Sequence, residues 1–205
     1  MRPDPRPLRG ISRVALSVAA LAPLFFALGC GGDEHTSVSA KARVNAKSGA
    51  VWGRDLANGL GLQEWELCSE LGAYDCISEA HRITLGGVEP TVLGIDEPLP
   101  NASVSAPIAV DRVATSACGL RYDRDKSGDT PVIFGPVLKK DSGRAREEVA
   151  DALIRRLLAR ESTKAELESL VALYDTLAPI SKDLPRDGAV GMCVIVATST
   201  EALFY

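Results

Sequence analysis

Sulfur is the most reactive element in this sequence, because a cysteine thiol can be acylated, oxidised to a disulfide, bound to a metal or used as a nucleophile. Cys30 stands where an apolar run gives way to glycine and acidic residues, in the stretch FFALGCGGDEH at 25–35. Four more cysteines follow at wide spacing: Cys68, Cys76, Cys118 and Cys193. The position of the first and the even number of the others indicate two different uses of sulfur.

The residues before Cys30 have the pattern of an export signal. Four arginines precede an apolar stretch at 14–28 that is too short to span a bilayer comfortably. The tetrapeptide ALGC at 27–30 resembles the signal of bacterial lipoproteins, in which the cysteine sulfur receives a diacylglyceryl group and cleavage leaves that cysteine first. The resemblance implies a signal peptide over residues 1–29, lipidation of Cys30, and acyl chains that bind the mature protein to a membrane.

The region after Cys30 predicts a tether and an address. Residues 30–50 are polar and rich in small side chains, which predicts a flexible tether before a single domain at 51–205. Gly31 differs from the aspartate that retains some bacterial lipoproteins in the inner membrane, so we expect an outer-membrane protein that faces the periplasm. Loss of residues 1–29 removes four arginines and Asp4, which changes the formal charge from −4 to −7. Nothing in this acidic chain indicates a nucleic-acid partner.

The four remaining cysteines predict two disulfides, because an exported protein matures where such bonds persist. Three pairings are possible. The separation of eight residues between Cys68 and Cys76, with Gly72 between them to allow a turn, favours a local bond there and a long-range bond from Cys118 to Cys193. A metal site at these cysteines is the alternative, but their spacing matches no closed zinc pattern, and C-x-x-C-H for haem attachment is absent from the sequence.

Enzymatic chemistry has few candidates here. Cysteine or serine catalysis with a histidine base would have to use His81, because the other histidine, His35, falls in the predicted tether. The best hydrolytic group would combine His81 with Glu79 and Glu89. Scattered carboxylates in an acidic protein usually form a solvated surface, and a histidine on a short helix is usually structural. We therefore expect a protein without enzymatic activity and without a cofactor.

The stretch DRDKSGD at 123–129 has the beginning of a calcium loop. Asp123, Asp125, Ser127 and Asp129 provide oxygen atoms, and Gly128 stands at the sixth place for the sharp turn. The twelfth place, which should carry a bidentate carboxylate, is Phe134. A polar surface turn is the alternative interpretation of the same residues.

The elements that must position these residues are mostly helical. Hydrophobic spacing predicts a helix at 63–71, a short helix at 76–83 capped by Asp75, and a helix from Ser105 to about Tyr122 with Val113 and Ile108 on its inner face. A long proline-rich loop at 88–107 precedes the last of these, and such loops often bind a ligand. Both tryptophans, Trp52 and Trp65, are expected to pack in or near the core.

The last third has the clearest pattern. An apolar stripe predicts a helix at 146–160, and a capping box from Thr163 to Glu166 predicts the start of a second helix that ends before Pro179. These two helices should form an antiparallel hairpin. Residues 188–205 fit either a helix or a buried strand, and their length favours a helix. The fold class we predict is therefore mainly α: a small helical domain with a long proline-rich loop, stapled by disulfides, after a flexible tether.

This C-terminal region also resembles the helical region of planctomycete-type multidomain proteins that are associated with c-type cytochromes. The resemblance rests on an arginine pair, a helix that ends in Leu-Tyr-Asp and an aromatic end of the chain; the residues are Arg155, Arg156, Tyr174, Asp175, Leu203, Phe204 and Tyr205. It implies a helical module that works beside a separate cytochrome, or one retained after a cytochrome domain was lost.

Two functions follow as hypotheses. The first is a lipid-anchored envelope protein that acts as a non-enzymatic binding or structural module, with the membrane and an unknown envelope protein as partners. The second is an accessory subunit of an exported, cytochrome-associated redox assembly.

Overall fold

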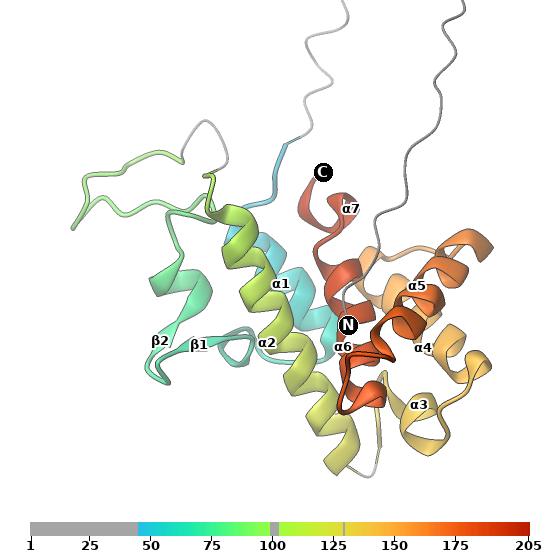
Figure 1. Ribbon diagram of the computed structural model, residues 1–205. Helices are drawn as coiled ribbons and strands as arrows, with labels where there is room; N and C mark the ends of the chain where they lie inside the picture. The colour runs from blue at the N-terminus through green and yellow to red at the C-terminus, as the bar shows by residue number, and fades with distance from the viewer. Residues whose placement is uncertain (1–44, 99–102, 129) are drawn as a thin grey trace, which may run out of the picture. The chain divides into compact units, whose positions relative to one another are not determined.

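The computed structural model describes residues 45–98, 103–128 and 130–205 (Figure 1). The predicted mainly α class is confirmed. The α-helices are α1 (Gly49–Leu60), α2 (Ala106–Ser127), α3 (Gly135–Lys139), α4 (Gly143–Leu158), α5 (Lys164–Leu177), α6 (Leu184–Ala197) and α7 (Thr200–Leu203). The remaining elements are a 3₁₀ turn η1 (Glu64–Glu66), an antiparallel hairpin of β1 (Ser69–Glu70) and β2 (Tyr74–Asp75), and a π-helical turn η2 (Cys76–Ala80).

Two predicted features lie outside these ranges. The signal peptide at 1–29 and the lipidation site Cys30 are not among the described residues. Within the described part of the chain, no helix combines the length and the apolar character that a membrane crossing needs. Residues 45–50, which we predicted to belong to the tether, are part of the fold: Ala46 forms an antiparallel bridge with Phe204, and the Gly49 N–H donates to the Leu85 carbonyl at 2.7 Å.

Helix α6 packs against α2, α4 and α5 (Figure 1). Its inner residues are small or flexible, and Ala189, Met192 and Cys193 are fully buried. The helix begins at the Asp183 side chain, which accepts a hydrogen bond from the Arg186 N–H. The predicted C-terminal helix is confirmed over α6, but it ends at Ala197, and Ser199 caps the separate helix α7.

Gly188 allows α6 to approach α5 closely. A methyl group built on Gly188 would lie 2.4 Å from a ring carbon of Tyr174, which is fully buried. The guanidinium of Arg146 also lies over the Tyr174 ring, 4.1 Å from the ring centroid. Arg146 also pairs with Asp141 at 2.7 Å, and this interaction lowers the pKa of the Asp141 carboxyl. The tyrosine ring is therefore in close contact with the backbone of one helix and with a cation of another.

Helices α4 and α5 pack against each other across a short connection, as predicted. The predicted capping box is present: the Thr163 hydroxyl accepts from the Glu166 N–H at 3.3 Å, and the Glu166 carboxylate accepts from the Thr163 N–H at 2.8 Å. Val149, Leu153 and Ile154 of α4 are buried, which is the apolar stripe seen in the sequence.

Arg160 joins this helix pair to the C-terminal helix. Its guanidinium pairs with Glu166 at 2.6 Å and with Glu201 of α7 at 2.7 Å. The pKa of Glu166 falls to about 2, first because Arg160 donates to the carboxylate and then because the Thr163 N–H and hydroxyl donate to it. The charged form of Glu166 is therefore favoured by folding.

A long-range disulfide and a buried ion pair hold α2 in place. Cys118 of α2 is bonded to Cys193 of α6, 75 residues later in the chain, which is the long-range pairing that the spacing favoured. One turn beyond Cys118, Arg121 pairs with the buried Asp125 at 2.7 Å. The Asp125 carboxylate accepts three further hydrogen bonds at 2.8 Å, from the backbone N–H groups of Val132, Ile133 and Phe134.

These contacts correct the calcium-loop prediction. Asp123, Asp125 and Ser127 lie in the last turns of α2 and not in a loop, and Asp129 is not among the described residues. Asp125 uses its oxygen atoms on Arg121 and on the backbone, while Asp123 pairs with Arg186 at 3.1 Å. The described residues contain no group of three or more histidines, cysteines or carboxylates that could hold a metal ion.

Two further predictions about helices are wrong in part. The helix predicted at 63–71 is only the η1 turn, whereas α1 covers Gly49–Leu60 and ends at Gly61, whose left-handed φ of 64° closes the helix. Trp52 is buried as predicted, but Trp65 is exposed. Helix α2 extends past Tyr122 to Ser127, and Ile108, predicted for its inner face, points to solvent.

The contact between Gly188 and Tyr174 generates a stability prediction. We expect Gly188→Ala to lower the free energy of unfolding by about 2–3 kcal/mol, because the new methyl group overlaps a ring that cannot move. The measurement is urea unfolding of the oxidised protein. Gly119→Ala is the matched control, because a methyl group there meets only Arg186 Nη2 at 3.5 Å and raises the helix propensity of α2 by up to about 1 kcal/mol. Equal destabilisation by both variants would contradict this account.

The pairing of Glu166 generates a pH prediction. A carboxyl whose pKa is lower in the folded state stabilises the protein above its ordinary pKa of 4.5 and loses that contribution as the pH falls toward about 2. Glu166→Gln keeps the capping box but removes the charge, so stability should decline less steeply between pH 5 and pH 2 than in the wild type. Urea midpoints across this range measure the slope. Glu168→Gln, which removes an exposed partner of Lys164, should leave the slope unchanged.

Candidate functional site

The segment 62–98 forms one side of the protein and contains the first disulfide. Cys68 and Cys76 are bonded across the β1–β2 hairpin, which is the local pairing favoured by their spacing, and both are buried. Leu71 and Gly72 turn the chain at the hairpin tip with φ values of 53° and 70°. A leucine with positive φ costs about 1–2 kcal/mol relative to an ordinary conformation, and this one is 92% exposed. The hairpin tip therefore presents an apolar side chain to solvent.

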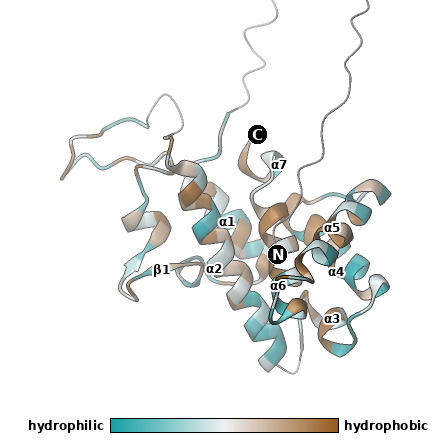
Figure 2. Cartoon of the chain, in the orientation of Figure 1, coloured by the Kyte–Doolittle hydropathy of each residue, from teal (hydrophilic) through white to brown (hydrophobic). Residues whose placement is uncertain are grey.

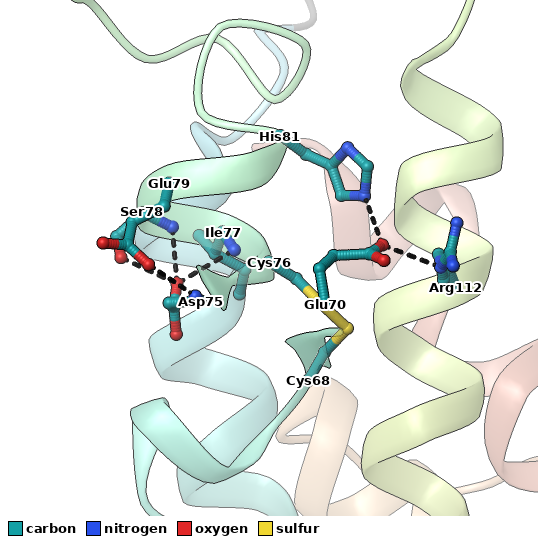
Figure 3. The surroundings of a disulfide bond; sticks show 9 residues. All are labelled: Cys68, Glu70, Asp75, Cys76, Ile77, Ser78, Glu79, His81 and Arg112. Carbon is teal, nitrogen blue, oxygen red and sulfur yellow. Dashed lines mark hydrogen bonds and ion pairs between the residues drawn. A yellow bond between two sulfur atoms is a disulfide. The ribbon is translucent and has the colours of Figure 1, made fainter. Parts of the chain in front are cut away.

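Asp75 starts the η2 turn, as predicted from the sequence. Its carboxylate accepts from the N–H groups of Ile77 and Ser78 at 3.0 and 2.6 Å and from the Ser78 hydroxyl at 2.7 Å. Glu79 completes the cap by accepting a hydrogen bond from the Asp75 N–H at 2.7 Å (Figure 3). These bonds fix the path of the chain directly after the disulfide.

Glu70 connects the hairpin to α2 (Figure 3). Its Oε1 atom lies 3.2 Å from Nε2 of His81 and 2.8 Å from Nε of Arg112. The carboxylate is mostly buried and lies between the imidazole and the guanidinium, so it is shared by two nitrogen groups from different segments. This arrangement orients His81 and links the disulfide-closed segment to α2.

The structure does not assemble the hydrolytic group that the sequence suggested. His81 faces Glu70, whereas Glu79 points toward the Asp75 cap on the other side of η2 (Figure 3). Glu89 pairs with Arg82. The pKa of the Glu89 carboxyl is lowered mainly by the hydrogen bond from the Thr91 hydroxyl and, to a lesser extent, by the charge of Arg82. Each of the three candidates therefore has its own partner.

Two adjoining pockets border this segment. The first, with a volume of about 750 Å³, has mixed walls that include Trp65, Ile77 and Arg82. The second, of about 610 Å³, is lined by Trp52, Val110 and other residues of α1, α2 and the C-terminus. Both have the size of ordinary small-molecule sites. Neither pocket could be predicted from the sequence, because the walls of each come from segments far apart in the chain.

The two pockets share a wall formed by Gly49, Leu85 and neighbouring residues. The Gly49 N–H donates to the Leu85 carbonyl, and a methyl group on Gly49 would lie 2.6 Å from Cβ of Leu85. Only a glycine lets α1 approach the 83–87 turn this closely. The long loop begins directly after this turn, and an isolated antiparallel bridge between Glu89 and Ile95 closes a turn within it.

Large apolar side chains are exposed along segment 62–98 and near the start of α2. Figure 2 shows that α2 is hydrophobic near its beginning and hydrophilic at its end, and Ala106, Pro107 and Val110 near its beginning line the second pocket. The exposed apolar residues of this side, which we call the apolar rim, are Trp65, Leu71, Tyr74, Val92, Leu93, Val104 and Ile108. Trp65 borders the first pocket and Val104 the second, and exposed apolar side chains beside a pocket are typical of an interaction surface.

The segment 62–98 also carries a large negative net charge. It contains eight carboxylates and one arginine, a formal charge of −7, which equals the net charge of residues 30–205. Several of these carboxylates are paired: Glu66, for example, accepts two hydrogen bonds from Arg124, which lowers its pKa. Asp96 and Glu97 are exposed.

The residues that carry the cytochrome-associated resemblance make contacts within the fold. Arg155 pairs with Asp151 at 2.9 Å, Arg156 donates to the Gly59 carbonyl at 2.6 Å, and Asp175 pairs with Arg146 at 2.6 Å. Leu203–Tyr205 pair with residues 45–47. These contacts explain the residues structurally.

No protein-family model matches the chain, and no curated protein or solved structure matches it. The function is therefore inferred from the chain's own residues and their geometry.

Proposed function

We propose that this protein is a lipid-anchored protein of the bacterial cell envelope that acts as a non-enzymatic binding module. The observation that carries the proposal is the use of sulfur. Four of the five cysteines pair with one another inside the fold, so the fold requires nothing of Cys30. Cys30 follows directly on the apolar end of an export signal, where the sulfur of a lipoprotein receives its diacylglyceryl group.

The disulfides support export independently of the signal sequence. Disulfides persist in the periplasm and are rare in the bacterial cytosol. The bond between Cys118 and Cys193 joins two residues that are 75 positions apart, so it closes a long loop of the chain. A bond over such a distance contributes on the order of 4 kcal/mol in the chain-entropy account.

The binding surface in this proposal is the apolar rim and the first pocket. Trp65 is 72% exposed and borders that pocket, and aromatic residues in such positions commonly dominate the energy of protein interfaces. The partner we propose is another envelope protein that covers Trp65 and the hairpin tip. The acidic charge of segment 62–98 favours a partner with basic side chains around its contact.

Acylation of Cys30 is the first test. We expect the mature wild-type protein to begin at Cys30, to carry fatty acids there and to sediment with membranes, whereas Cys30→Ala should carry none. Mass spectrometry of the N-terminal peptide and fractionation of cells measure both effects. The double variant Cys68→Ala/Cys76→Ala is the control, because it removes two other sulfurs and should remain acylated. A wild-type product that begins at another residue, or that lacks fatty acid, would overturn the anchor.

Photo-crosslinking is the second test. A photoreactive phenylalanine analogue in place of Trp65 should give a discrete adduct with one envelope protein in living cells. The same analogue in place of Ile180, which is 78% exposed and lies after α5, should not. Equal labelling from both positions would argue against a specific surface at Trp65. A haem protein as the adduct would favour the role beside a cytochrome.

A further inference from the structure

The second pocket has walls suited to hydrocarbon. Trp52, Leu85 and Val110 line it, and each is less than a tenth exposed. The one polar atom of the Trp52 ring already has a partner, because its N–H donates to the Ala197 carbonyl at 3.1 Å. Leu203 and Phe204 complete the lining from the C-terminus. A ligand in this pocket would therefore meet mainly apolar surface and would need few hydrogen-bonding groups.

The charged group at the pocket is already neutralised. Lys47 is the charged residue of the lining, and its ammonium pairs with Asp55 at 2.9 Å and lies 5.7 Å from the centre of the Tyr205 ring. A ligand with a free carboxylate or phosphate would have to displace Asp55. An uncharged hydrocarbon chain would not, so the pocket favours hydrocarbon over an anion.

The N-terminal side of the fold begins at this pocket. Asn45, the first described residue, lines it together with Ala46 and Lys47. Backbone hydrogen bonds hold these residues in place: the Lys47 N–H donates to the Leu203 carbonyl at 2.8 Å, and the Tyr205 N–H donates to the Asn45 carbonyl at 3.0 Å. The chain that leads back to Cys30 therefore leaves the domain at the pocket.

Cys30 is close to the pocket along the chain. With the fourteen residues between them fully extended, Cys30 and Asn45 are at most about 50 Å apart, so the lipid on Cys30 is within reach of the pocket. A ligand tethered in this way has an effective concentration in the millimolar range, which favours it over the same hydrocarbon free in solution.

We propose that this pocket holds one hydrocarbon chain of the lipid on the protein's own Cys30. The inference rests on the lipid anchor proposed above and assigns a place to one of its chains. With one chain in the pocket, fewer chains remain in the bilayer. Because a single chain gives only reversible membrane binding, the domain then regulates how firmly it is anchored.

The test uses the full chain in its native cells, fed with a diazirine-labelled fatty acid that enters the lipid on Cys30. After irradiation, tandem mass spectrometry should find the Cys30 peptide joined through the lipid to peptides that contain 103–110 or 203–204. Ala106→Trp, which places an indole at the pocket wall, should lower this product at least five-fold. Thr115→Trp is the matched control on the same helix, because Thr115 is exposed and is not part of the lining, and it should leave the yield unchanged.

The outcomes separate the two proposals. If the label is on Cys30 but is joined only to phospholipid or to peptides elsewhere, the pocket proposal fails and the anchor stands. If the pocket peptides are labelled without being joined to the Cys30 peptide, the pocket binds membrane lipid, which also overturns the proposal. If Cys30 carries no label, the anchor itself fails. Thermal unfolding of both tryptophan variants checks that neither loses its fold.

Discussion

The ring of Tyr174 sets the distance between α5 and α6, and much of the helical core depends on that distance. The ring lies against the backbone at Gly188, and the Arg146 guanidinium lies over it. Any side chain at position 188 would push α6 away from α5. Because α6 also packs on α2 and α4, such a shift would loosen the packing on several sides at once. The Cys118–Cys193 bond acts on the same helix and fixes its position along α2.

The helices of the last third could be predicted because their signals are local. The capping box at Thr163 and the apolar stripe of α4 are visible in short windows of sequence, and the structure contains both. Helix α1 could not be predicted in the same way. Glycines usually weaken a helix, yet here they make room for neighbouring side chains. A methyl group on Gly53 would lie 2.5 Å from Cδ1 of Ile77, and one on Gly59 would lie 2.6 Å from Cδ2 of Leu157 at the end of α4. That closeness is a property of the tertiary fold, which no local pattern records.

The candidate site shows the same division. Asp75 as a cap and the Cys68–Cys76 bond depend on residues a few positions apart, and their spacing pointed to both. The acidic spacing at 123–127 was misleading, because these residues continue the helix α2, where residues two apart point to different sides: Asp125 meets Arg121 one turn earlier, and Asp123 meets Arg186. The partners of Glu70 and the walls of the two pockets come from distant segments. Nothing in a single sequence relates Val110 to Phe204, although both line the same pocket.

The ends of the domain are joined by a short antiparallel contact, in which residues 45–47 pair with 203–205. If the chain is held at its N-terminal side, mechanical load enters the domain through Asn45 and reaches these backbone bonds first. These bonds would break one after another, beginning with the bond between Asn45 and Tyr205, before the helices are pulled apart. Behind them, the bond between Cys118 and Cys193 ties α6 to α2 covalently. A pull on the N-terminal side would therefore release the terminal residues while the helical core stays closed.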